Sequence, residues 1–393
     1  MNSYIPADSL FPTDRPVSLE AMIGRHGEAT TLAGELCNGL NRLVAGPRRT
    51  GKTSVCRAAV SIAKTQGFYA AEVDLFEVVD LASLAERIID GAIANRAGLA
   101  RARRGVVRAG HKVASAVSLT AVAKVKADIG EELSFALETG WRRQNPLDAL
   151  RRSIEVAQRL CVVDDNRLIV FIDEFQELAG PRHPFGDPDA TTKALRSALS
   201  KADRITTLFA GSVEHMMRDL FNVTNRAFYR WGGWHSLEPI EEATWLAGLT
   251  GRYEMARFTL TPEAGTRLVA LGEQHPRATM LLAKQAYLAA ITAGSTLVTS
   301  VAVEEALGTA LAADRPFHDG VVEDLRRSGR NVLDTAERIA RGDPPYQDRK
   351  AASAAQRAIR DLEARGLLIK TAPTGRGGWR IADPLLRRYL AWR

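Results

Sequence analysis

Hydrophobic residues follow two patterns along the first half of the chain. Short, predominantly apolar runs occupy 43–45, 168–172 and 205–211, and 68–75 is a further strand candidate. Runs of this kind are typical of strands buried on both faces of a parallel sheet. The stretches 52–66, 80–89 and 146–160 instead carry apolar residues at three- and four-residue steps, which predicts helices. Because the two patterns alternate, the sequence predicts an α/β fold with a parallel sheet.

The pattern changes near residue 239, after a final short strand predicted at 234–237. Helical spacing recurs in 241–253, 262–271, 276–293 and 301–312, which we expect to form a helical lid. Helices at 331–340 and 351–366 precede strands at 367–372 and 379–382 around a glycine-rich turn, the order found in a winged helix. We therefore expect an N-terminal extension (1–20) without regular structure, an α/β core (21–238), the lid (239–312) and a winged-helix domain (313–393).

Composition and charge limit the partners and the location that we expect for this protein. The 393 residues carry a formal net charge of +7, and the pI near 9.4 is consistent either with polyanionic partners or with a solvated, Arg-rich surface. Cys37, Cys56 and Cys161 lie far apart without metal-ligand spacing, which indicates reduced thiols. The start of the chain lacks the features of a signal peptide, and no apolar run is long enough to cross a bilayer. We expect a cytoplasmic protein without membrane contact.

One stretch has the spacing of a phosphate-binding P-loop, Gly, any four residues, then Gly-Lys-Thr. The glycines allow successive N–H groups to face phosphate oxygens, the lysine adds positive charge, and the threonine is left to bind Mg²⁺. A glycine-rich turn without a ligand is the alternative, but a predicted strand and helix flank the motif as its function requires. The expected nucleotide contacts are Gly46, Pro47, Arg48, Arg49, Thr50, Gly51, Lys52, Thr53 and Ser54.

A second motif follows the apolar run at 168–172, where Asp173 and Glu174 end the predicted strand. Ligands of open α/β sheets bind at such strand ends. Asp173 matches the Walker B aspartate that holds Mg²⁺, and Glu174 matches the adjacent glutamate that orients an attacking water. The alternative is a strand end with an acidic helix cap. The paired carboxylates favour hydrolysis of ATP over phosphoryl transfer to a metabolite.

A basic segment interrupts the core. Residues 91–127 contain no Asp or Glu but eight Lys and Arg residues. We interpret 91–145 as an insertion with a basic helix and an alternating stretch at 117–125 that fits a hairpin strand. Such a segment is either a solvated charged face or a contact with nucleic acid or an acidic partner.

Together these motifs resemble the archaeal-type ATPases of the STAND branch, which are related to AAA+ initiators of the origin-recognition kind. The resemblance covers about residues 20–393 and rests on Gly24-Arg25, the P-loop, 172–174, Gly211-Ser212, His275-Pro276-Arg277 and 383–386. It implies a P-loop core of the additional-strand class, with ATP and Mg²⁺ as cofactors. It also implies a molecular switch whose C-terminal winged helix engages DNA or a protein.

The resemblance assigns further roles. Gly24 and Arg25 fall where these ATPases place a segment that closes over adenine. Ser212 stands at the sensor 1 position, and Arg277 stands at the sensor 2 position on the lid. The alternatives are an ordinary helix start at 24–25, a helix cap at Ser212 and a solvent-exposed arginine at 277.

An arginine near residue 230 resembles one that reaches a phosphate in cis or in trans. The match of Arg230 is loose because the family places glycine before it, whereas this chain has Tyr229, and Arg226 is a competitor. The role of the basic insertion stays open, as does oligomerisation.

Basic residues of the C-terminal domain are the predicted DNA contacts, with Lys350, Arg357 and Arg360 on or near a helix and Arg376 at the wing tip. Winged helices of signalling ATPases also bind proteins. The sequence therefore predicts a magnesium-dependent ATPase that acts as a switch. The alternatives are a DNA-binding regulator with a structural nucleotide and a signalling scaffold whose winged helix binds protein.

Overall fold

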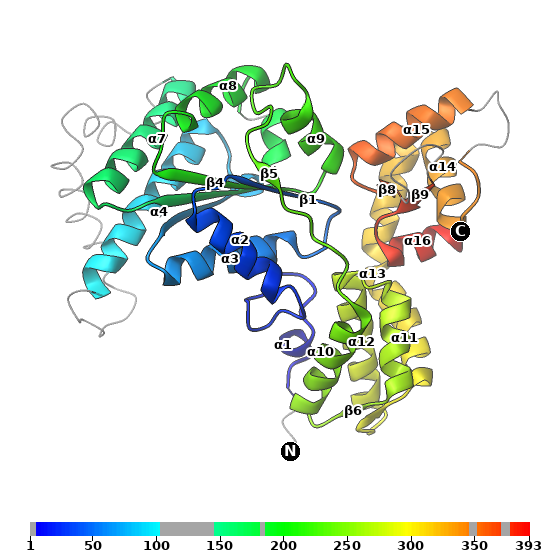
Figure 1. The fold of residues 1–393 in the computed structure, drawn as a ribbon. Helices are drawn as coiled ribbons and strands as arrows, with labels where there is room; N and C mark the ends of the chain where they lie inside the picture. Colours follow the sequence, from blue (N-terminus) through cyan, green and yellow to red (C-terminus); the bar gives the residue numbers. More distant parts are fainter. Residues whose placement is uncertain (1–4, 103–144, 181–184, 346–351, 371–377) are drawn as a thin grey trace.

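The computed structural model describes residues 5–102, 145–180, 185–345, 352–370 and 378–393. The chain forms an α/β core, a bundle of helices that lies below the core in Figure 1, and a C-terminal module at the right of that view. Most of the predicted basic insertion, including 117–125, lies outside the described residues. Among the described helices, none has the length and apolar character that crossing a bilayer requires.

The core is built on a five-stranded parallel sheet in the order β2-β3-β4-β1-β5. β4 lies between β1 and β3, so the strand that feeds the P-loop is not adjacent to the strand that ends in Asp173. This is the additional-strand arrangement expected from the sequence. The strands are β1 (Arg42–Ala45), β2 (Tyr69–Asp74), β3 (Leu168–Asp173), β4 (Ile205–Gly211) and β5 (Gly233–Trp234).

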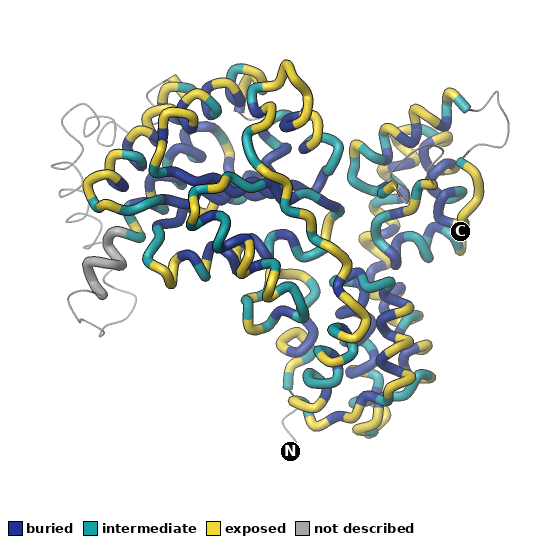
Figure 2. The backbone as a smooth tube through the Cα atoms, in the orientation of Figure 1, coloured by how far each residue is buried: buried dark blue, intermediate teal, exposed yellow. Residues whose placement is uncertain are grey.

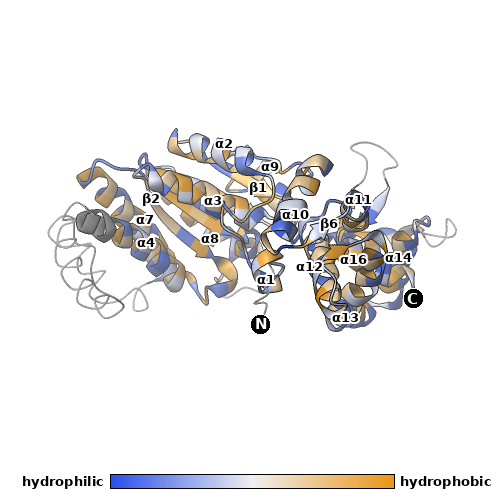
Figure 3. Cartoon of the chain, turned by 90° about the horizontal axis from the view of Figure 1, so that it is seen from below, coloured by the Kyte–Doolittle hydropathy of each residue, from blue (hydrophilic) through white to orange (hydrophobic). Residues whose placement is uncertain are grey.

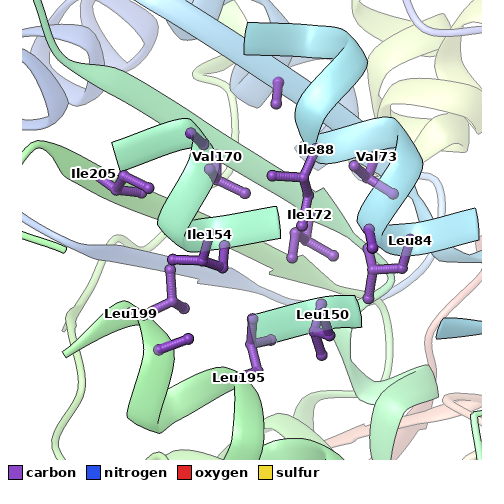
Figure 4. Packing of buried hydrophobic residues seen from close by; sticks show 14 of the residues in the cluster. Val73, Leu84, Ile88, Leu150, Ile154, Val170, Ile172, Leu195, Leu199 and Ile205 are labelled. Atoms are coloured by element: carbon purple, nitrogen blue, oxygen red, sulfur yellow. The ribbon is translucent and has the colours of Figure 1, made fainter. Parts of the chain in front are cut away.

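Helices cover both faces of this sheet, which explains why β3 is apolar throughout. Val170 and Ile172 face a cluster from one layer of helices, while Ile169 and Phe171 face a second cluster on the other side. Figure 4 shows the first cluster, and Figure 2 shows the buried strands between more exposed helices. One layer contains α4 (Leu81–Ala102), α7 (Pro146–Val163) and α8 (Pro188–Leu199); the other contains α2 (His26–Cys37) and α3 (Lys52–Thr65). The shorter helices of the core are η1 (Leu75–Glu77), η3 (Phe175–Ala179) and α9 (Glu214–Asn222).

The lid is a helical bundle with its own core, as predicted. In the view from below, hydrophobic residues gather where the helices face one another (Figure 3). Its elements are α10 (Glu242–Met255), β6 (Thr259–Leu260), α11 (Pro262–Gly272), α12 (Pro276–Thr292), β7 (Leu297–Val298) and α13 (Ser300–Ser328).

The N-terminal segment packs onto the lid, which the sequence did not predict. A single helical turn, α1 (Ala7–Leu10), replaces the expected irregular structure. Leu10 and Phe11 are fully buried in the lid core, and the ring of Phe11 lies 5.0 Å from that of Tyr253. The prolines on either side do not prevent this turn, because burial of the two apolar side chains stabilises it.

The C-terminal module has the element order of a winged helix. It contains α14 (Arg330–Arg341), α15 (Ala352–Ala364), the antiparallel strands β8 (Leu368–Lys370) and β9 (Trp379–Ile381), and α16 (Pro384–Ala391). The predicted helix at 301–312 continues through Pro316 to Ser328. Leu311 packs in the lid core, and Val322 and Leu325 pack in the core of the module. Because residues on both sides of Pro316 pack in these two cores, the proline is tolerated, and the expected boundary at 312/313 falls inside one helix.

Candidate active site

The strands of the sheet end together at one edge. Ala45 is paired with Gly211, and Asp74 with Asp173, at the carboxyl ends of β1, β4, β2 and β3. The P-loop leaves β1 and enters α3, whose N-cap is Gly51. The two sequence motifs, separated by more than a hundred positions, therefore meet as predicted.

Direct contacts connect the P-loop with the strand end. The hydroxyl Oγ1 of Thr53 donates a hydrogen bond to Oδ2 of Asp173 at 2.6 Å. The ammonium of Lys52 donates to the backbone oxygen of Pro47 at 2.6 Å and is buried. Burial lowers the pKa of Lys52, while Glu174 and Asp173 oppose that shift. Burial also raises the pKa of Asp173, against the hydrogen bond from Thr53. The site therefore brings a buried ammonium close to two carboxylates.

The donor set of Thr53 and Asp173 fits magnesium. Mg²⁺ prefers oxygen ligands and usually keeps several waters, so one or two protein oxygens plus phosphate oxygens suffice. In the described part of the chain, no group of three or more His, Cys, Asp or Glu side chains could hold a metal by itself. A metal at this edge would therefore be held jointly by Thr53, Asp173 and a bound phosphate.

Glu174 is held by three donor groups. Its Oε2 accepts hydrogen bonds from Oγ of Ser212 at 2.6 Å, from the backbone N–H of Ser212 at 3.3 Å and from Nε2 of Gln176 at 2.6 Å. Ser212 does not cap the next helix, because the N-cap of α9 is Val213 and no side chain bonds its N–H groups. The strand-end serine thus bonds the glutamate, at the position expected for sensor 1.

A cavity of about 940 Å³ lies in front of this edge. Ligand pockets commonly have volumes of about 300–1,000 Å³, so this cavity has the size of a small-molecule site. The predicted residues that line it are Arg25, Arg48, Arg49, Gly51, Lys52, Thr53, Ser54, Glu174, Ser212 and Arg277. The other predicted residues of the site do not line it: Gly24, Gly46, Pro47, Thr50, Asp173 and Arg230. Asp173 still belongs to the site through its bond to Thr53.

The segment with Gly24 and Arg25 closes one side of the cavity. Arg25 pairs with Glu28 at 3.1 Å, and burial lowers the pKa of its guanidinium. Gly24 adopts φ 65° and packs against Ile240 at the start of the lid. The preceding N-terminal residues contribute too, since the N–H of Val17 donates to Oγ of Ser54 at 3.1 Å.

Arg277 faces the cavity but is bound by a carboxylate. Its guanidinium forms a two-point contact with Asp314 of α13, with Nη2 2.8 Å from Oδ1. Burial alone would raise the pKa of Asp314, but the hydrogen bond and charge of Arg277 lower it overall. The sensor 2 candidate is therefore held by Asp314 at the junction of lid and C-terminal module.

Arg49 extends from the P-loop to the C-terminal module. Its Nη1 lies 3.7 Å from Oδ2 of Asp383, and its guanidinium stacks 4.2 Å from the ring centre of Phe317. Asp383 is also the N-cap of α16. A phosphate-binding loop and a winged helix therefore share a charged contact.

The remaining candidates lie elsewhere. Arg230 adopts φ 56°, is exposed and lies over the ring of Tyr229. Arg226 pairs with Asp189 at 3.4 Å. Arg357 and Arg360 are exposed on α15. Lys350 and Arg376 lie outside the described residues.

Sequence reasoning missed several residues of the site. Gln176, Asp314, Phe317 and Gly366 contact predicted site residues, and 12–17 line the cavity. Only Gln176 stands near a motif, two positions after Glu174. The others are distant in sequence, and their spacing carries no signal.

The sheet order and the P-loop define the fold as that of an additional-strand P-loop NTPase with a helical lid and a C-terminal winged helix. No family model matches the chain, and none of the curated proteins does. Solved structures do match. The Walker-type ATPase PABY2304 of Pyrococcus abyssi is similar over 97% of this chain and 99% of its own, with TM-score 0.68 and 16% identity. The ORC2 protein of Aeropyrum pernix, in ADPNP-ADP complexes, is similar over 97% of this chain and 95% of its own, with TM-score 0.57 and 17% identity. At these identities, the similarity shows the fold.

Proposed function

We propose that this protein is a magnesium-dependent ATPase that works as a molecular switch. The observation that carries the proposal is the 2.6 Å hydrogen bond between Thr53 and Asp173, which places the P-loop beside the carboxylates. In this proposal Lys52 and the loop N–H groups bind the phosphates. Thr53 and Asp173 hold Mg²⁺, and Glu174 orients the attacking water. Bound Mg²⁺ would neutralise charge on the phosphates.

The switch is supported by two contacts between the site and the C-terminal module. Gly366 follows α15, and a Cβ at this position would lie 3.3 Å from the backbone oxygen of Ser212. Arg49 pairs with Asp383 on the other side of the cavity. A nucleotide that moves Ser212 or Arg49 therefore acts on the module directly. The switch would have two arrangements of the C-terminal module relative to the site. The fraction of the protein in each arrangement would depend on how differently the two bind the nucleotide.

The test compares three variants. Glu174→Gln should retain ATP binding and lose steady-state phosphate release, because an amide does not accept the proton of water. Lys52→Ala should lose binding. Glu177→Gln is the matched control, since Glu177 belongs to the same turn but does not line the cavity. Retained turnover in Glu174→Gln would remove the role of this residue, and an inactive wild type with bound ATP would favour a structural nucleotide.

DNA is the partner that the exposed face of α15 favours. Ser353, Gln356, Arg357 and Arg360 are exposed and follow the spacing of one helical face. Neither arginine pairs with an acidic residue in the described ranges. The helix also ends beside Gly366, so a ligand on α15 has a short path to Ser212.

A salt titration of binding to a labelled duplex tests the DNA proposal. The double variant Arg357→Ala/Arg360→Ala should weaken binding and reduce the slope of log K against log salt by about 0.9 for each lost phosphate contact. Arg326→Ala/Arg327→Ala is the control, because it removes the same charge from α13, where both arginines pair with Glu323. Equal slopes in all three proteins would favour the signalling scaffold with a protein partner.

A further inference from the structure

We propose that Gln176 is a positioning residue for ATP hydrolysis, which holds the carboxylate of Glu174 so that one of its oxygens stays available to the attacking water. This inference rests on the proposed ATPase function and adds a residue to it. Gln176 lies in η3, directly after the strand that carries the carboxylates.

The geometry of the hydrogen bonds carries the argument. Ser212 directly follows β4 and Gln176 lies in η3, yet their donors converge on the same oxygen, Oε2 of Glu174. A carboxylate oxygen has about two lone-pair sites, so these donors use its capacity, and Oε1 accepts no hydrogen bond from any described residue. Glu174 also lines the cavity. The two donors therefore fix the rotation of the carboxylate and leave Oε1 as the acceptor for water.

The amide orientation of Gln176 follows from chemistry. A carboxylate accepts hydrogen bonds and does not donate them, so the NH₂ group of the amide must face Glu174. The oxygen Oε1 of Gln176 then points the other way, toward β4, where a Cβ at Gly211 would come within 2.6 Å of it. The glycine at the end of β4 gives the amide the room it needs.

Packing alone does not account for a glutamine here. The side chain is fully buried, and its Oε1 has no hydrogen-bond partner among the described residues. An unpaired buried acceptor is unfavourable, and methionine would fill a similar volume without one. The bond to Glu174 is the interaction that methionine could not provide.

Holding the carboxylate matters because Glu174 has several rotatable bonds. A general base acts only within hydrogen-bond reach of its water, and a displacement of about 1 Å can cost roughly a hundredfold in rate. Ser212 restrains the carboxylate from the strand side, and Gln176 restrains it from the turn. Loss of either donor should lower the rate of the chemical step without changing the phosphate-binding loop.

The experiment measures single-turnover phosphate release and ATP affinity in the full chain. Gln176→Met should lower the hydrolysis rate about tenfold and change the dissociation constant for ATP by less than about twofold. Leu178→Val is the matched control, because Leu178 is a buried apolar residue of the same turn. Thermal unfolding of each variant shows whether it folds. If Gln176→Met does not fold, Gln176→Leu makes the same comparison, because its side chain is apolar and cannot donate.

A double-variant cycle separates positioning from packing. In a Glu174→Gln background, Gln176→Met should cause no further loss of the residual rate, because the group it positions is gone. The inference is overturned if the tenfold loss persists in that background, or if Gln176→Met hydrolyses ATP like the wild type. An inactive wild type would instead overturn the ATPase proposal, and full activity in Glu174→Gln would remove only the role of Glu174; the inference falls in both cases.

Discussion

Asp383 joins the C-terminal module to the P-loop, and its charge can be removed while its capping role is kept. The carboxylate accepts hydrogen bonds from the N–H groups of Leu385 and Leu386 at 2.9 and 3.2 Å and faces Arg49 at 3.7 Å. Asparagine caps helices about as well as aspartate. Asp383→Asn therefore removes the ion pair with Arg49 and leaves α16 intact.

The free energy lost with the ion pair follows from the distance between its charges and from the exposure of the two side chains. Two unit charges about 4 Å apart attract by about 4 kcal/mol at an effective dielectric constant of roughly 20. The Arg49 side chain is 33% exposed and that of Asp383 is 17% exposed, so solvent and lost side-chain freedom reduce the net value. We expect about 1 kcal/mol, or roughly a fivefold shift in the equilibrium between contact and separation of the module and the P-loop. The stacking of Arg49 on Phe317 is not changed.

Nucleotide release measures this shift, because residues of the module line the cavity. The dissociation rate of a fluorescent ADP analogue, chased with unlabelled ADP, should rise up to about fivefold in Asp383→Asn. High salt should reduce the difference between variant and wild type. Asp187→Asn is the control: Asp187 also caps a helix that begins with proline, but it lies away from the cavity. Unchanged or slower release in Asp383→Asn, with an unchanged melting temperature, would show that the ion pair does not hold the module.

Two further predictions concern stability. Phe11→Ala should lower the free energy of unfolding by about 3–5 kcal/mol in urea titrations, because it empties a fully buried site in the lid. Met255→Ala, at an exposed lid position, is the control and should change the free energy of unfolding little. Equal effects of the two variants would mean that the N-terminal segment is not docked. The pH dependence of the melting temperature tests His318, which is fully buried with neither ring nitrogen bonded to a described residue. Burial lowers the pKa of His318, Asp383 and Asp314 oppose this, and Arg277 and Arg49 add to it. The folded protein therefore prefers the neutral ring, so its contribution to stability is complete above the unfolded pKa of about 6.5 and is lost as pH falls below it. His318→Phe should reduce the loss of stability between about pH 7 and 5, and an identical pH profile would exclude this role.

Local sequence patterns predicted the core because its central strands are apolar and are separated by helices with clear spacing. The uninterrupted run of β3 indicated burial on both faces, and helices do cover both. Patterns failed where packing between distant segments overrides local preference. The sequence predicted a helix that ends at 312, yet α13 continues through Pro316 to Ser328, and Leu311 and Leu325 pack in two different cores. In the same way, the turn at α1 is stabilised because Phe11 is buried in the hydrophobic core of the lid.

The residues of the candidate site also fall into two groups: those that local motifs predict and those that packing between distant segments places. Motif spacing located Lys52, Thr53 and the carboxylates because one strand and one helix fix their geometry. It did not locate the partners of Arg49 and Arg277, because Asp383 and Asp314 lie hundreds or tens of positions away. Their positions depend on how the lid and the C-terminal module pack. Spacing in one sequence does not report such packing.

The partners of the cavity residues constrain how nucleotide could control the module. Ser212 bonds Glu174 with its side chain and faces Gly366 with its backbone oxygen. A movement of α15 at Gly366 would therefore reach the carboxylate of Glu174 through one residue, and a phosphate that draws Ser212 away would reach α15 by the same route. Linkage requires ATP and a ligand on α15 to change each other's affinity by the same factor. The effect of such a ligand on the affinity for ATP is therefore measured apart from its effect on the hydrolysis rate. An acceleration without any change in ATP affinity would require the ligand to act on the rate of the chemical step alone.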